Sequence, residues 1–128
     1  MSQNQNDEKG LGKGIKLITS EQINTLPVSI REWVGNQKVH SGLHKIQMED
    51  EEYTLISLGM RPNPGYQLQV TNIVQQDNQV KVEVAEQEPT PGTFYPQMIV
   101  YPFILTKSDV PINVEGLSHA QTKNPQSK

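Results

Sequence analysis

The fold is decided by residues 66–84, YQLQVTNIVQQDNQVKVEV. Apolar and polar side chains alternate over residues 66–70 and again over residues 80–84, and this period of two predicts two strands that each bury one face. The polar residues 76–79 between them are typical of a turn. The alternation changes phase after residues 71–72, which predicts a β-bulge there. These features predict an antiparallel hairpin with one face in solvent.

Segments on both sides of this hairpin extend the β pattern. Residues 15–18 and 53–58 are predicted as strands, and residues 39–48 as a weaker strand. Residues 98–105, MIVYPFIL, are apolar on both faces, as a central strand is. Pro102 has no N–H group to donate, so this strand must be bulged at the proline, lie at an edge, or begin after it.

One short helix is predicted near the N-terminus. The apolar residues of 27–34 fall at helical spacing, the proline that opens the stretch suits a first turn, and Gly35 supplies a stop. Trp33 shares the apolar face, so we predict that it packs in the core rather than anchoring a partner. Upstream, Thr19 or Ser20 is suited to cap a helical turn.

The length of 128 residues fits one domain. We predict a single β-rich domain over residues 15–109. Residues 1–14 are polar and glycine-rich without an apolar period, which is typical of a disordered arm, and residues 110–128 are expected to be mostly flexible tail. The predicted class is mainly β (α+β at most): a small antiparallel β-sheet sandwich or half-open barrel with one short N-terminal helix.

Charge and composition exclude several partners. The formal net charge is −3, which argues against nucleic acid as the main ligand, and no segment approaches the roughly 20 apolar residues of a membrane span. The absence of cysteine excludes disulfides and thiolate metal sites. No signal-peptide pattern follows Met1. We therefore expect a cytoplasmic protein if Met1 is the native start, and an exported or cell-surface protein if a signal was removed.

No catalytic or metal-binding pattern stands out. His40 and His44 are four residues apart, but the glycine between them disfavours a helix that would present both to a metal ion. Ser108, Asp109 and His119 lack the strained nucleophile turn that accompanies a hydrolase triad. The sequence predicts no enzyme, no metal and no cofactor.

Two stiff loops and a short aromatic segment carry the binding hypothesis. Residues 59–66, GMRPNPGY, join two predicted strands through two prolines, and residues 89–96, PTPGTFYP, combine three prolines with two aromatic side chains. Stiff loops bind with little ordering cost. A plainer interpretation stays open, in which the loops are turns and each aromatic side chain tucks into the core. The candidate partner-binding residues are Arg61, Pro62, Asn63, Pro64, Gly65, Tyr66, Pro91, Gly92, Phe94, Tyr95, Tyr101, Pro102 and Phe103.

In this order, the strand at residues 53–58, the loop, the hairpin and the Pro91-Gly92 turn resemble the PrcB-like C-terminal domain over residues 53–107. That family usually has Gly-x-Arg/Lys-Pro-Thr-Gly-Gly-Tyr in the loop, whereas Asn63-Pro64 stands here in place of Thr-Gly. The resemblance implies a protein that is often exported and that stabilises or assembles with a protease, without catalytic residues of its own.

The same loop also looks like the Asn-Pro-Thr-Thr-Gly-Tyr loop of chagasin-like peptidase inhibitors. The leading hypothesis is a non-enzymatic protein-binding module that stabilises or helps assemble a partner protein, a protease by the resemblance. A peptidase inhibitor is the first alternative. The second is a structural domain that forms a homodimer by pairing residues 53–58 or 80–84, if either strand lies at a sheet edge.

Overall fold

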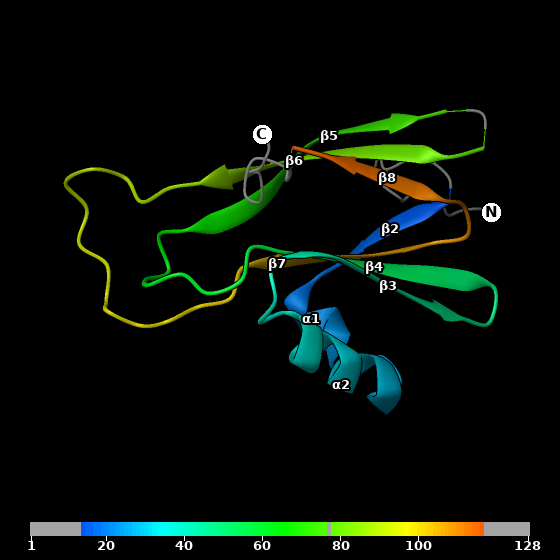
Figure 1. Ribbon diagram of the computed structural model, residues 1–128, viewed down its shortest axis with the longest axis horizontal. Coiled ribbons are helices and arrows are strands. Elements are labelled where there is room, and N and C mark those ends of the chain that lie inside the picture. The colour runs from blue at the N-terminus through cyan, green and yellow to red at the C-terminus, as the bar shows by residue number, and fades with distance from the viewer. Residues whose placement is uncertain (1–13, 77, 117–128) are drawn as a thin grey trace.

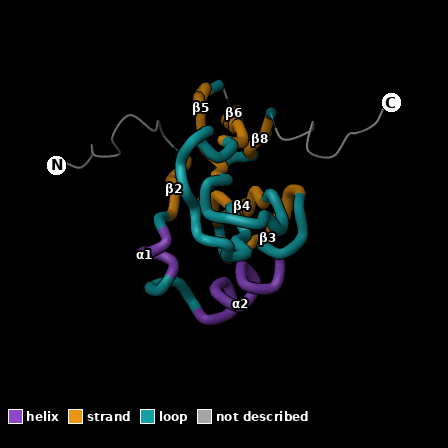
Figure 2. Tube along the Cα trace, turned by 90° about the vertical axis from the view of Figure 1, so that its left-hand side faces the viewer, coloured by secondary structure: helices purple, strands orange, loops and turns teal. Residues whose placement is uncertain are grey.

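The chain is arranged in three layers in the computed structural model, which describes residues 14–76 and 78–116 (Figures 1 and 2). Figure 2 shows a three-stranded sheet at the top, a four-stranded sheet in the middle and two helices below it. The fold is therefore mainly β, as predicted. The described strands form two separate sheets, so the architecture is a sandwich and not a half-open barrel.

The four-stranded sheet is antiparallel and has the order β2-β7-β4-β3. Its strands are β2 (Ile15–Ile18), β7 (Phe103–Ser108), β4 (Glu51–Ser57) and β3 (Gly42–Met48). The three-stranded sheet has the order β5-β6-β8, with β8 parallel to β6. Its strands are β5 (Gln67–Gln75), β6 (Val80–Gln87) and β8 (Ile112–Glu115). The predicted hairpin is β5–β6, and its register shifts between Val70 and Asn72, where the bulge was predicted.

Two helices cover the outer face of the four-stranded sheet. α1 (Ser20–Ile23) begins with a capping box in which Thr19 and Gln22 exchange hydrogen bonds of 3.0 and 3.2 Å. α2 (Val28–Gln37) follows Pro27 as predicted, but it continues through Gly35. The prediction of one helix was incomplete, because α1 is a single turn that its cap stabilises more than its apolar pattern does.

The core has two parts because β4 is buried on both faces. Ile56 and Leu58 pack between the sheets against the valines of β6, whereas Tyr53 and Leu55 pack under the helices with Val34. Trp33 is half-buried against this second cluster, so its predicted packing role is confirmed. Alternate residues of β4 therefore hold the three layers together.

Three predictions need correction. The predicted strand 98–105 is shorter than expected, because residues 93–99 have no regular structure. Its strand, β7, begins only after Pro102, which is one of the three arrangements that the proline allowed. Within the expected tail, residues 110–128, a short segment forms β8, because Ile112 packs in the core beside β6. Residues 117–128 lie outside the described residues. Residues 53–58 and 80–84 lie in the interior strands β4 and β6, so neither offers an edge for a homodimer.

Candidate functional site

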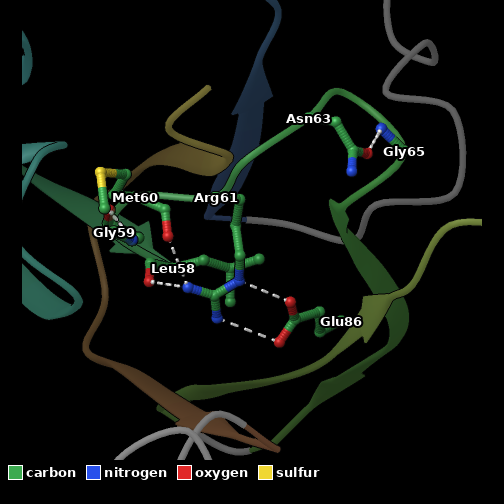
Figure 3. A network of polar contacts seen from close by, with 8 residues as sticks. Leu58, Gly59, Met60, Arg61, Asn63, Gly65 and Glu86 are labelled. Carbon is green, nitrogen blue, oxygen red and sulfur yellow. Dashed lines mark hydrogen bonds and ion pairs between the residues drawn. The ribbon is translucent and has the colours of Figure 1, made fainter. Parts of the chain in front are cut away.

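Arg61 fixes the base of the loop that leaves β4 (Figure 3). Its Nε and Nη2 donate to the two carboxylate oxygens of Glu86, at 2.7 and 3.2 Å, and its Nη1 donates to the carbonyl oxygens of Leu58 and Met60, at 3.0 and 2.9 Å. The planar guanidinium group suits this two-point pairing. The hydrogen bond to Glu86 raises the pKa of Arg61 above its usual value, so Arg61 stays charged.

The backbone of Arg61 ties this loop to the second candidate loop. Arg61 and Val100 exchange two backbone hydrogen bonds of 2.9 Å and form an isolated β-bridge. The Arg61 guanidinium carbon also lies 5.9 Å from the centroid of the Tyr66 ring, within the range of a cation–π contact. Arg61 therefore holds the loops in place, and its guanidinium group is engaged within the chain.

The middle of the first loop is shaped by Asn63 and Gly65. Asn63 Oδ1 accepts the N–H of Gly65 at 2.8 Å, which closes an Asx turn (Figure 3). Gly65 is buried, and a Cβ atom there would lie 2.9 Å from both Pro89 Cβ and Tyr95 Cζ. Only a residue without a side chain fits at this point, where the two loops pack together.

The second loop, residues 88–102, projects from the sandwich at the left of Figure 1. It carries a turn in which Thr93 N–H donates to Thr90 O at 3.1 Å, with Gly92 at φ +83° in the position that a type II turn reserves for glycine. Thr90 N–H donates to Tyr95 Oη at 3.1 Å, and this hydrogen bond lowers the pKa of Tyr95 below 10.0. The loop is thus ordered by its own contacts.

Large apolar side chains are exposed on this ordered loop. Phe94 is 92% exposed, Ile99 58% and Met98 53%. Met60, on the first loop, is also exposed. Large apolar side chains that gather on a fixed loop are typical of a protein-interaction site.

Two shallow clefts open beside the first loop. The first has a volume of about 560 Å³ and is lined by Pro62, Asn63, Pro89, Thr93, Phe94, Tyr95, Gln97 and Ile99. The second has a volume of about 330 Å³ and is lined by Pro64, Tyr66, Gln67, Leu68, Val100, Tyr101, Pro102 and Phe103. The first cleft is lined by Pro62 and Asn63 of the loop, and the second by Pro64 and Tyr66, so the loop forms the ridge between them.

Most of the sequence-predicted site residues come together at this end of the sandwich. Four of these residues line neither cleft. Arg61 and Gly65 hold the first loop in place through their contacts, and Pro91 and Gly92 lie at the exposed turn of the second loop. The other nine line one cleft or the other. The sequence analysis did not identify Glu86 as part of the site. Val80, Val82 and Val84 point into the core, and the same alternation along β6 places Glu86 on that face.

The residues considered for catalysis make structural contacts. Ser108 is buried, and its Oγ donates to Val110 O at 2.7 Å. A nitrogen of His44 lies 2.8 Å from the His40 carbonyl oxygen. His119 lies outside the described residues. Within residues 14–76 and 78–116 no group of three or more His, Cys, Asp or Glu side chains is placed to hold a metal ion, and no helix there is long and apolar enough to cross a membrane.

Residues 53–108 match the family model described as PrcB C-terminal, which confirms the resemblance noted from the sequence. The matched segment runs from β4 to the end of β7, so it contains both loops, both clefts and the Arg61–Glu86 pair. No curated protein and no solved structure gives a significant match to the chain.

Proposed function

We propose, from the match of residues 53–108 to the PrcB C-terminal family model, that this chain is a protein-binding module whose partner is a protease. The protease-related part of this proposal rests on the family match. The binding surface is the end of the sandwich formed by residues 59–66 and 88–102. The module stabilises or helps assemble its partner and catalyses no reaction itself.

One observation supports this assignment most directly. Phe94 is 92% exposed on the second loop. The Arg61–Val100 bridge holds the base of that loop, and the Arg61–Glu86 pair holds the first loop beside it. An exposed aromatic side chain on a fixed backbone loses little conformational entropy when a partner covers it. Such side chains are enriched among the residues that dominate binding energy.

The test compares two double variants of the tagged full chain in the cells that produce it. Phe94→Ala with Ile99→Ala removes exposed apolar area from the second loop, and Val28→Ala with Leu43→Ala removes it from surfaces elsewhere. We expect a protease, identified by mass spectrometry, to co-purify with the parent and the control pair and to be lost from the loop pair. Equal retention by both pairs, or no protease with the parent, would refute the proposal.

The activity of the retained protease separates stabiliser from inhibitor. A stabiliser preserves or raises protease activity over time, whereas an inhibitor lowers it at equimolar amounts. The inhibitor alternative draws on one feature of the structure, which is that three predicted loop segments lie at the same end of the sandwich.

A further inference from the structure

We infer that the two clefts bind a single uncharged segment of the partner protein, which crosses the ridge of residues 61–66 and places one apolar side chain in each cleft. This inference rests on the proposed function and names the chemistry of the partner segment.

The charge of the clefts selects the segment. None of the eight residues that line the first cleft and none of the eight that line the second is charged. Residues 89–106 form an unbroken run without Asp, Glu, Lys or Arg, in a chain that is 20% charged. A charged side chain placed in either cleft would lose hydration without meeting an opposite charge among the lining residues, so charged segments are disfavoured.

The lining also fits a peptide backbone. Gln97 lies in the first cleft and Gln67 in the second, and both side chains are exposed. A side-chain amide both donates and accepts hydrogen bonds, as a peptide group does. Prolines and aromatic rings supply the rest of each wall, and such walls accept extended segments of partner chains.

The ridge explains why one segment reaches both clefts. Asn63 lines the first cleft and Pro64, the next residue, lines the second. On the opposite wall, Ile99 lines the first and Val100 the second. The clefts thus adjoin at the Arg61–Val100 bridge, and adjacent anchors on an extended segment suffice to fill both.

Two other occupants are outcomes of the test. A lipid surface would place the aromatic side chains among acyl chains, but the charge-free run offers no cation to phospholipid headgroups. A second copy would have to cover the same ridge. The uncharged lining with an amide in each cleft favours a protein segment over a lipid surface, and the identity of the cross-linked product distinguishes the partner from a second copy.

The experiment places a photo-crosslinker in each cleft. The full chain carries p-benzoylphenylalanine at Phe94 or at Tyr101, with the exposed residue Val28 of α2 as the control position, and is irradiated in the cells that produce it. We expect positions 94 and 101 to cross-link to the same uncharged stretch of one partner, and position 28 to give no such product. Cross-links to lipid, to a second copy or to a charged stretch, or products at only one of the two cleft positions, would overturn the inference.

Isosteric charge substitutions test the same inference without bulky probes. Gln97→Glu and Gln67→Glu each introduce one negative charge into a cleft, and Gln47→Glu on β3 introduces the same charge outside both. We expect each cleft variant to bind the co-purified protease about tenfold more weakly and the control to bind like the parent. Unchanged binding by either cleft variant overturns the inference, yet leaves the proposed function intact if the Phe94→Ala, Ile99→Ala pair still loses the protease.

Discussion

Arg61 and Glu86 join the two sheets of the sandwich through hydrogen bonds of 2.7 and 3.2 Å. Arg61 follows β4 of one sheet, and Glu86 lies on the inward phase of β6 in the other. The Glu86 side chain is only 13% exposed and that of Arg61 23%. The pair therefore closes the end of the core directly beneath the proposed binding surface.

Arg61→Ala should be strongly destabilising, because it leaves the Glu86 carboxylate largely buried without its partner. We expect the free energy of unfolding, measured by urea denaturation, to fall by about 2–3 kcal/mol, somewhat less than for a fully buried pair. Lys81→Ala, which removes looser ion pairs of 3.6 and 3.9 Å, should cost less than about 1 kcal/mol. Equal losses in the two variants would contradict this prediction.

Gly65→Ala should disturb the contact between the two loops. The new Cβ atom would lie 2.9 Å from Pro89 and from Tyr95, so the loops must move apart, at a cost of about 1–3 kcal/mol in unfolding free energy. Gly35→Ala is the matched control, since a Cβ there meets no atom of the described residues within 4 Å and alanine favours the helix by up to about 1 kcal/mol. Thermal unfolding should show a lower melting temperature for Gly65→Ala and a higher one for Gly35→Ala than for the parent. A neutral Gly65→Ala would show that the loops do not constrain each other.

Thr54→Val should stabilise the fold. Thr54 is fully buried, and its Oγ1 has no hydrogen-bond partner among the described residues. Valine has nearly the same shape without the unsatisfied hydroxyl, so we expect a gain of about 1 kcal/mol in urea unfolding. Thr106→Val, opposite it on β7, removes a hydroxyl that donates to the Thr54 carbonyl at 3.4 Å and should bring no gain. A loss of stability in Thr54→Val would mean that its hydroxyl is satisfied.

The ionisation of Tyr95 should report on the second loop. Because the Thr90 N–H donates to its Oη, the pKa of Tyr95 lies below 10.0 in the folded chain. A lowered pKa means that the hydrogen bond favours the phenolate, and its contribution to stability disappears as the pH falls through that lowered value. Titration of tyrosinate absorbance should show an early component that is absent from Tyr95→Phe. A parent curve that matches the Tyr95→Phe curve in shape would refute this.

Binding to the co-purified protease should depend little on salt. The clefts carry no charge, so screening has no attraction to weaken. We expect the dissociation constant to change less than about twofold between roughly 0.05 and 0.5 M salt. A steep weakening would show that charged residues outside the clefts dominate binding.

The fold was predictable where the pattern is local. The alternation of β5 and β6 and the phase change after residues 71–72 appear directly in the sequence. The structure has the hairpin, with the bulge between Val70 and Asn72. β8 was not predictable, because its four residues pair with β6 in parallel across a long separation in the chain. The alternation of apolar and polar residues within one segment gives no information about a contact between distant segments.

The site was partly predictable for a similar reason. Proline and glycine marked the loops, since these residues restrict or free the backbone wherever they occur. The exposure of the second loop could not be predicted. Met98 and Ile99 stand in an apolar run that is typical of a buried strand, yet none of the described strands pairs with them. Glu86 could have been assigned from the inward phase of β6, but its partner Arg61 lies 25 residues away.

The parallel pairing of β8 has a practical consequence for fragments. The segment that matches the family model, residues 53–108, contains the interior strands of both sheets but lacks β2, β3, β8 and both helices. The missing elements supply Ile15, Ile30 and Ile112 to the core, among other residues. A piece cut at those limits would expose the backbone edges of β4, β6 and β7 and uncover both parts of the core. The smallest autonomous folding unit is therefore wider than the segment that matches the family model, and truncation should keep residues 14–116.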